Sequence, residues 1–126
     1  MIGYIMFGTN DLKKSIKFYD SFLNKLDLVK TDYQKEFVGY ANKYDQENII
    51  FYITKPFDGG QASFGNGTMV AFRAFSREIV DNVYELALKN GAANEGKPGV
   101  RKGYENMYYS YFRDLDNNKI CVYSKI

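Results

Sequence analysis

The chain has 126 residues, a formal net charge of +2 and a 25% share of charged residues, which is typical of one globular domain. So small a charge argues against nucleic acid and an acidic membrane as partners, and no apolar run reaches the roughly 18–20 residues that span a bilayer. The single cysteine excludes an internal disulfide, and the absence of histidine removes the commonest metal ligand and the commonest general base.

The first half of the chain predicts one strand, one helix and three further strands. Apolar or β-prone runs predict the strands at residues 2–8, 28–33, 37–43 and 48–54. After the first strand, residues 9–11 supply a helix cap with early negative charge. Apolar side chains then recur at helical spacing on one face: Leu12, Ile16, Tyr19, Leu23 and Leu26. We expect this face to pack against the sheet.

The second half repeats this order of elements. An apolar run predicts a strand at 67–75, and Ser76 is a favourable cap for a helix whose apolar face includes Ile79 and Val83. Asn90 and Gly91 are typical of the end of a helix. Residues 94–103 are polar and contain Gly and Pro, which predicts a weak strand and a loop. The chain closes with a hairpin of two strands, at 108–113 and 120–123, around a polar turn.

The repeated order predicts an α+β fold built from two βαβββ modules. The modules cover about 1–55 and 67–126 and are joined by a short linker, so that residues 1–126 form a single domain. Each module has one helix to cover one face of its sheet, and the other face is also largely apolar or aromatic. We therefore expect a curved, partly open mixed sheet around a central cavity, with the helices outside.

Three local motifs resemble one known family. Asn10-Asp11-Leu12 followed by Ser15 and Phe18-Tyr19 resembles the start of its first helix. Residues 65–72, Gly-Asn-Gly-Thr-Met-Val-Ala-Phe, resemble the entry to its second module, and residues 112–120, Phe-Arg-Asp-Leu-Asp-Asn-Asn-Lys-Ile, resemble its last hairpin. In this order and spacing the motifs resemble the vicinal oxygen chelate superfamily, which includes glyoxalase I, extradiol dioxygenases and bleomycin-resistance proteins. Paired βαβββ modules are its architecture.

The resemblance also places the four positions at which the metal enzymes of that family carry ligands, mostly His and Glu. Here they fall at Tyr4, near Ile50, at Met69 and at Cys121. None is His, Asp or Glu, whereas a divalent metal of this class requires imidazole and carboxylate donors. We therefore expect no metal, no cofactor and no catalytic residue of the family type.

Strand alternation predicts which other side chains face the cavity. Tyr52 shares a face with Ile50, Arg73 with Met69, and Tyr109 with Tyr111. The predicted ligand-binding cavity is therefore lined by Tyr4, Ile50, Tyr52, Met69, Arg73, Tyr109, Tyr111 and Cys121. Such a lining suits a small, planar or partly aromatic molecule, held by stacking on rings, by phenol hydrogen bonds and by one arginine charge.

Three functions remain open on the sequence. The first is a metal-free protein that binds a small molecule, similar to the drug-sequestering members of the family. The second is a metal-dependent lyase or dioxygenase, as the enzymes of the family are. The third is a purely structural dimer module. We expect a homodimer in the cytoplasm, because relatives commonly dimerise and a lone cysteine suits a reducing compartment.

Two further signals do not predict chemistry. Asp114, Asp116 and Asn118 have the spacing that opens a calcium-binding loop, but Lys119 stands where that loop needs glycine, which favours a solvated turn. Cys121 has no histidine to activate it as a nucleophile, and a cysteine within a strand is usually a small buried hydrophobe.

Overall fold

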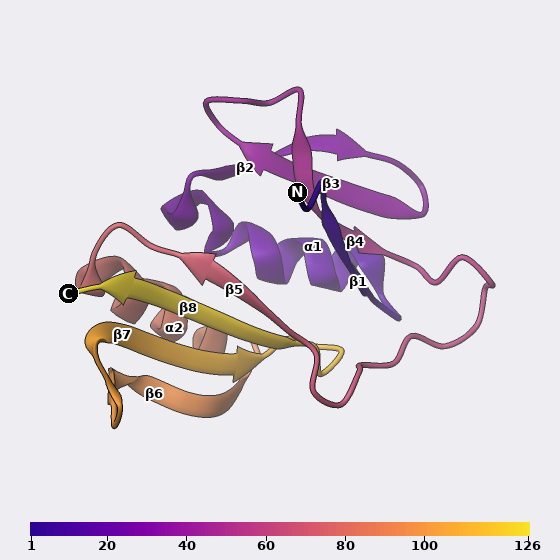
Figure 1. The fold of residues 1–126 in the computed structure, drawn as a ribbon. Coiled ribbons are helices and arrows are strands. Elements are labelled where there is room, and N and C mark those ends of the chain that lie inside the picture. The colour runs from indigo at the N-terminus through magenta and orange to yellow at the C-terminus, as the bar shows by residue number, and fades with distance from the viewer.

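The computed structural model describes residues 1–126 and shows an α+β fold with two four-stranded mixed sheets (Figure 1). The first half contains β1 (Ile5–Gly8), α1 (Leu12–Asp20), the 3-10 helix η1 (Leu23–Leu26), β2 (Leu28–Tyr33), β3 (Phe37–Asn42) and β4 (Ile49–Thr54). The second half contains β5 (Met69–Arg73), α2 (Arg77–Lys89), β6 (Ala93–Arg101), β7 (Tyr104–Arg113) and β8 (Lys119–Lys125). The repeated β-α-β-β-β order confirms the predicted fold class.

The two sheets have the same strand pairing. Their orders are β1-β4-β3-β2 and β5-β8-β7-β6, and in each the first strand runs parallel to the last while the other pairs are antiparallel. β1 and β5 are therefore edge strands of their sheets, and Figure 1 shows both near the middle of the molecule. The strands fall within the predicted segments 1–55 and 67–126, and the division of a single domain into these two modules stays a prediction.

The predicted first helix is interrupted after Asp20. Asp11 caps α1 as expected, since its carboxylate accepts a hydrogen bond from the Lys14 backbone. At the other end the Ser21 hydroxyl donates to the Phe18 carbonyl at 2.6 Å, and Phe22 leaves the helical region with φ −138°. The chain resumes as the tighter η1, so Leu23 still reaches the core although one continuous helix to Leu26 is wrong.

The second helix begins where the sequence predicts. The Ser76 hydroxyl accepts from the Ile79 backbone at 3.3 Å, which caps α2. After Asn90, Gly91 has φ +108°, a left-handed conformation that favours glycine and turns the chain out of the helix. No helix in the structure is long and apolar enough to cross a membrane.

Several strands differ in extent from the prediction, and in the last hairpin β7 starts at Tyr104 instead of Tyr108 while β8 continues to Lys125 instead of Tyr123. β1 starts at Ile5 instead of Ile2, and β5 starts at Met69 because Gly67 has φ +96° in a turn where Thr68 donates to the Gly65 carbonyl. β6 extends over nine residues where a weak strand and a loop were expected. Its pairing with β7 is irregular, with register shifts near Gly96 and Gly99, and so its sequence lacks the alternation of a regular strand.

One continuous core joins the helix-facing sides of both sheets. It holds 21 buried residues from both halves of the chain, and aromatic rings carry the contact between the halves. Phe112 of β7 packs edge-on against Phe22 at 5.6 Å between centroids, and Phe51 of β4 packs against Phe72 of β5 at 5.2 Å. Val70, Phe72, Ile120 and Val122 lie on this side, as predicted by alternation. The opposite sides of the sheets are left uncovered within the chain.

Replacing Phe112 with alanine tests this shared core. Phe112 is fully buried, so Phe112→Ala should lower the free energy of unfolding by about 3–5 kcal/mol, measured by urea denaturation followed by circular dichroism. The same substitution at the fully exposed Phe57 is the matched control and should change stability little. Equal losses in the two variants would contradict the core described here.

Candidate functional site

The uncovered side of the second sheet carries the densest group of tyrosines. Strand register aligns Ala71, Cys121 and Tyr111 in one row across β5, β8 and β7, and Arg73, Tyr123 and Tyr109 in the next. Because Phe112, Ile120 and Val122 point into the core, these residues point the other way. We call this surface the tyrosine face and define it by Met69, Ala71, Tyr109, Tyr111, Cys121 and Tyr123.

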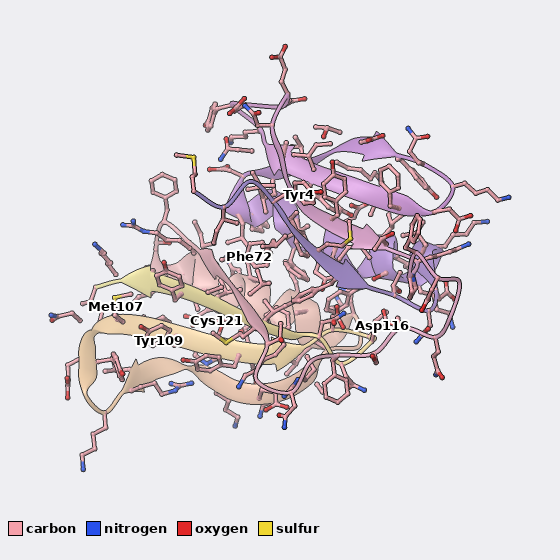
Figure 2. All side chains as sticks on the ribbon, turned by 45° about the vertical axis from the view of Figure 1, so that its right-hand side comes forward. Tyr4, Phe72, Met107, Tyr109, Asp116 and Cys121 are labelled. Carbon is pink, nitrogen blue, oxygen red and sulfur yellow. The ribbon has the colours of Figure 1, made fainter.

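The tyrosine face is hollowed into a pocket of about 580 Å³. Tyr109 stacks on Tyr111 with centroids 5.9 Å apart and planes 17° from parallel, and the Tyr123 ring lies 5.8 Å from Tyr109. Figure 2 shows Met107, Tyr109 and Cys121 together on the second sheet. The complete lining is Met69, Ala71, Arg101, Lys102, Tyr104, Met107, Tyr109, Tyr111, Cys121 and Tyr123.

The other predicted site residues surround neighbouring hollows. Tyr4 and Ile50 line a second pocket of about 360 Å³, and this pocket shares Met69 and Ala71 with the first. Tyr52 is in edge contact with Tyr4, at 5.1 Å between centroids. Arg73 borders a third pocket, beside Phe75 and Lys125. The structure thus places four of the eight predicted residues in the main pocket and distributes the others around it; their binding role stays a prediction.

Ala71 and Tyr123 follow from the same strand alternation as Met69 and Cys121, and four further lining residues were missed by the sequence analysis: Arg101, Lys102, Tyr104 and Met107. Met107 could have been found, because extending the alternation of Tyr111 and Tyr109 by two residues reaches it. Arg101 could not, because it ends the irregular strand β6, where pairing with β7 skips residues.

Cys121 lies at the floor of the pocket and is 1% exposed. Burial raises the pKa of its thiol to about 11, and the nearby positive charges of Arg101 and Lys119 offset only part of that effect. The thiol is therefore protonated at neutral pH, and it is a poor nucleophile. Burial also raises the pKa of Tyr111, so the pocket presents neutral hydroxyl and thiol groups.

The donor set does not fit the metal centre that the resemblance implies. Tyr4, Ile50, Met69 and Cys121 offer a phenol, a hydrocarbon, a thioether and a protonated thiol. No group of three or more His, Cys, Asp or Glu side chains lies close enough together to hold a metal ion. The chemistry of the pocket is therefore that of aromatic rings, neutral hydroxyls and cations.

The turn between β7 and β8 is a buried polar junction, which corrects the expectation of a solvated turn. Asp114 is 3% exposed and accepts hydrogen bonds from the Tyr19 hydroxyl, from the backbones of Asp116 and Asn118, and from the Asn118 side chain. Asn118 also donates to the Gly8 carbonyl, at 3.0 Å. The turn thus fastens the second module to the end of β1 and to α1, and these groups are satisfied without calcium.

Burial raises the pKa of Asp114, and the hydrogen bonds from Tyr19 and Asn118 offset part of the increase. Because the pKa in the folded protein lies above that in the unfolded chain, ionisation of Asp114 lowers stability as pH rises through this interval. The Tyr19 hydrogen bond opposes that loss, since it stabilises the ionised carboxylate.

The comparisons with known proteins agree with this geometry. A family model described as the Glyoxalase/Bleomycin resistance protein/Dioxygenase superfamily matches residues 1–122. A solved glyoxalase/bleomycin resistance protein from Albidiferax ferrireducens is 34% identical, with 98% of each chain covered and a TM-score of 0.87. A fosfomycin resistance protein from Mesorhizobium loti is 16% identical, covers 100% of this chain and 92% of its own, and has a TM-score of 0.70, which shows the fold alone. A search of curated proteins finds no match.

Replacing Tyr19 with phenylalanine tests the buried junction. Tyr19→Phe removes one donor from the Asp114 carboxylate and should cost about 1–3 kcal/mol of unfolding free energy at pH 7. The cost should be smaller at pH 4, where a larger share of Asp114 is protonated. Urea denaturation at both pH values measures this, with the exposed Tyr44→Phe as control. A cost that is the same at both pH values would show that the hydrogen bond does not act on the ionised form.

Proposed function

The chain belongs to the glyoxalase/bleomycin resistance protein/dioxygenase superfamily, and from that premise we propose that it binds a small, partly aromatic molecule on the tyrosine face without using a metal ion. The observation that carries this proposal is the pocket of about 580 Å³, which is lined by stacked tyrosine rings. Its volume is within the range of small-molecule sites, and its lining is mostly apolar with a few polar groups at the edge.

The arrangement of the rings supports an aromatic ligand. The Tyr109 ring lies 6.3 Å from Tyr104 and 5.8 Å from Tyr123 between centroids, and tyrosine rings at such spacing offer both faces and edges for stacking. Their hydroxyls can donate to or accept from polar groups of the ligand. Binding such a ligand requires no nucleophile from the protein and no cleavage of a bond.

Binding is favoured over metal-dependent lyase or dioxygenase activity by the donor set. Those reactions need a metal bound by imidazole and carboxylate groups, and the corresponding positions here are Tyr4, Ile50, Met69 and Cys121. The 34% identical relative from Albidiferax ferrireducens is named a glyoxalase/bleomycin resistance protein, which agrees with a role that centres on a small molecule.

A homodimer in the cytoplasm belongs to the same proposal. Tyr4, Ile50 and Met69 are large apolar side chains that are 61%, 41% and 43% exposed around one pocket. Such a cluster is typical of a surface covered by another chain, which is also what the purely structural dimer module of the third hypothesis would need. Sedimentation velocity distinguishes the dimer from a monomer, and a monomer at all concentrations would contradict this part.

Replacing Tyr109 with alanine tests binding on the tyrosine face. A thermal-shift panel of planar aromatic and peptide-like compounds identifies a ligand, whose affinity is then measured by calorimetry. Because Tyr109 contacts three other rings of the pocket, Tyr109→Ala should weaken that affinity by about tenfold. The control, Tyr33→Ala on the exposed side of β2, should bind as the unaltered protein does. The proposal fails if no aromatic compound stabilises the protein or if Tyr109→Ala binds equally well.

A further inference from the structure

Resting on the proposed aromatic site, we infer that the ligand is an aromatic carboxylate, with its ring on the tyrosine face and its carboxylate between Arg101 and Lys119. The pocket is bordered by cations and by no acidic side chain. Arg101 and Lys102 line it directly, and Arg73, Lys119 and Lys125 belong to strand positions of the same sheet face. None of these five side chains forms a salt bridge in the structure.

Arg101 is held over the tyrosine face before any ligand arrives. Its guanidinium carbon lies 5.5 Å from the centroid of the Tyr111 ring, and one guanidinium nitrogen donates to the Lys97 carbonyl at 2.6 Å. That is its only hydrogen bond, so most of its five N–H donors remain available for an anion. A guanidinium that is already oriented loses little freedom when it binds a carboxylate.

Two glycines of β6 make room for this guanidinium. A Cβ atom on Gly96 would lie 3.1 Å from Nη2 of Arg101 and 2.9 Å from Cδ2 of Tyr111, and one on Gly99 would lie 3.2 Å from Nη1. Any side chain at Gly96 would therefore displace Arg101, Tyr111 or both. The irregular pairing of β6 near these glycines leaves a space that the Arg101 guanidinium occupies.

Lys119 supplies the second cation. Its Nζ lies 5.5 Å from the centroid of the same Tyr111 ring. The Glu95 carboxylate accepts a hydrogen bond from Arg113 at 2.8 Å, which lowers the Glu95 pKa, and the Lys119 charge contributes to the same shift. Lys119 lines the neighbouring hollow beside Phe64, and Arg101 lines the main pocket, so an anion near the Tyr111 ring would be attracted by a cation from each.

The groups under this position suit a carboxylate joined to a ring. The side chains of Ala71 and Cys121 are small, so this pair of register partners leaves a depression in the sheet surface beside the larger Tyr109 and Tyr123. A planar ring can lie along that depression against the tyrosines, next to the cations that border the pocket. An anion without a ring would leave the aromatic lining unused, and a ring without charge would leave both cations unpaired.

Isosteric probes test the charge separately from the ring. Calorimetry compares 2-naphthoate with 2-naphthamide, which has the same ring and no charge, and with cyclohexanecarboxylate, which has the charge and no aromatic ring. We expect 2-naphthoate to bind at least about tenfold more tightly than either, with an affinity that falls as salt is raised. Equal binding of the amide would overturn the inference and leave the proposed aromatic site standing. Absence of binding by all three would contradict the inference and the proposed function together.

Three variants localise the charge. Arg101→Gln and Lys119→Gln should each weaken 2-naphthoate binding by about tenfold while 2-naphthamide binding changes less than about twofold. Lys13→Gln, which removes the same charge from the exposed side of α1, is the control and should change neither. If Lys13→Gln reduces 2-naphthoate binding as much as Arg101→Gln, only the total charge of the protein matters and the assigned position is wrong.

Gly96→Ala tests the position of the Arg101 guanidinium against β6 without removing a charge. It should reduce the preference for 2-naphthoate over 2-naphthamide, because the added methyl group displaces the guanidinium. Circular dichroism confirms that the variant is folded, and the ratio of the two affinities is a quantity that a general loss of stability does not change. If the ratio of the two affinities is unaltered, β6 does not position Arg101 for binding a carboxylate.

Discussion

The burial of one face of the β7–β8 hairpin in the core determines how the rest of the structure is arranged. Phe112, Ile120 and Val122 are fully buried against the helices and against Phe18 and Phe22 of the other module. Since neighbouring residues of a strand point to opposite faces, that packing directs Tyr109, Tyr111 and Tyr123 outward, onto a side that no element of the chain covers. The same contacts that stabilise the fold therefore produce the aromatic surface on which we propose that a ligand binds.

The Asp114 junction fixes how the two modules meet. The Asp114 carboxylate accepts a hydrogen bond from Tyr19 of α1, and the nearby Asn118 side chain donates one to the Gly8 carbonyl of β1. One turn of the second module therefore contacts two elements of the first. Edge strands β1 and β5 are thereby brought to the border of one pocket, with Met69 and Ala71 shared between the hollows on either side. A polar group buried with all its partners specifies one arrangement more strictly than apolar packing alone.

Regular alternation explains why the tyrosine face could be predicted from the sequence, and irregular backbone explains what could not. Tyr109, Tyr111 and Cys121 lie on strands with uninterrupted register, so their common side follows from counting residues. Arg101 lies where β6 skips residues against β7, and no periodicity locates its guanidinium over Tyr111. Asp114 was expected in a solvated turn because Lys119 stands where a calcium loop needs glycine. Its partner Tyr19 is 95 residues away along the chain, and no local pattern reveals that contact.

We propose that this member of a superfamily with metal enzymes binds an aromatic molecule through tyrosines and cations alone. Calorimetric titration of 2-naphthoate into protein stripped with a chelator, and into the same protein supplied with nickel, zinc, manganese or iron, tests it most directly. We expect the same affinity in every sample, because no group of metal-binding side chains borders the pocket. Binding that is lost on chelation and restored by one of these metals would contradict the claim.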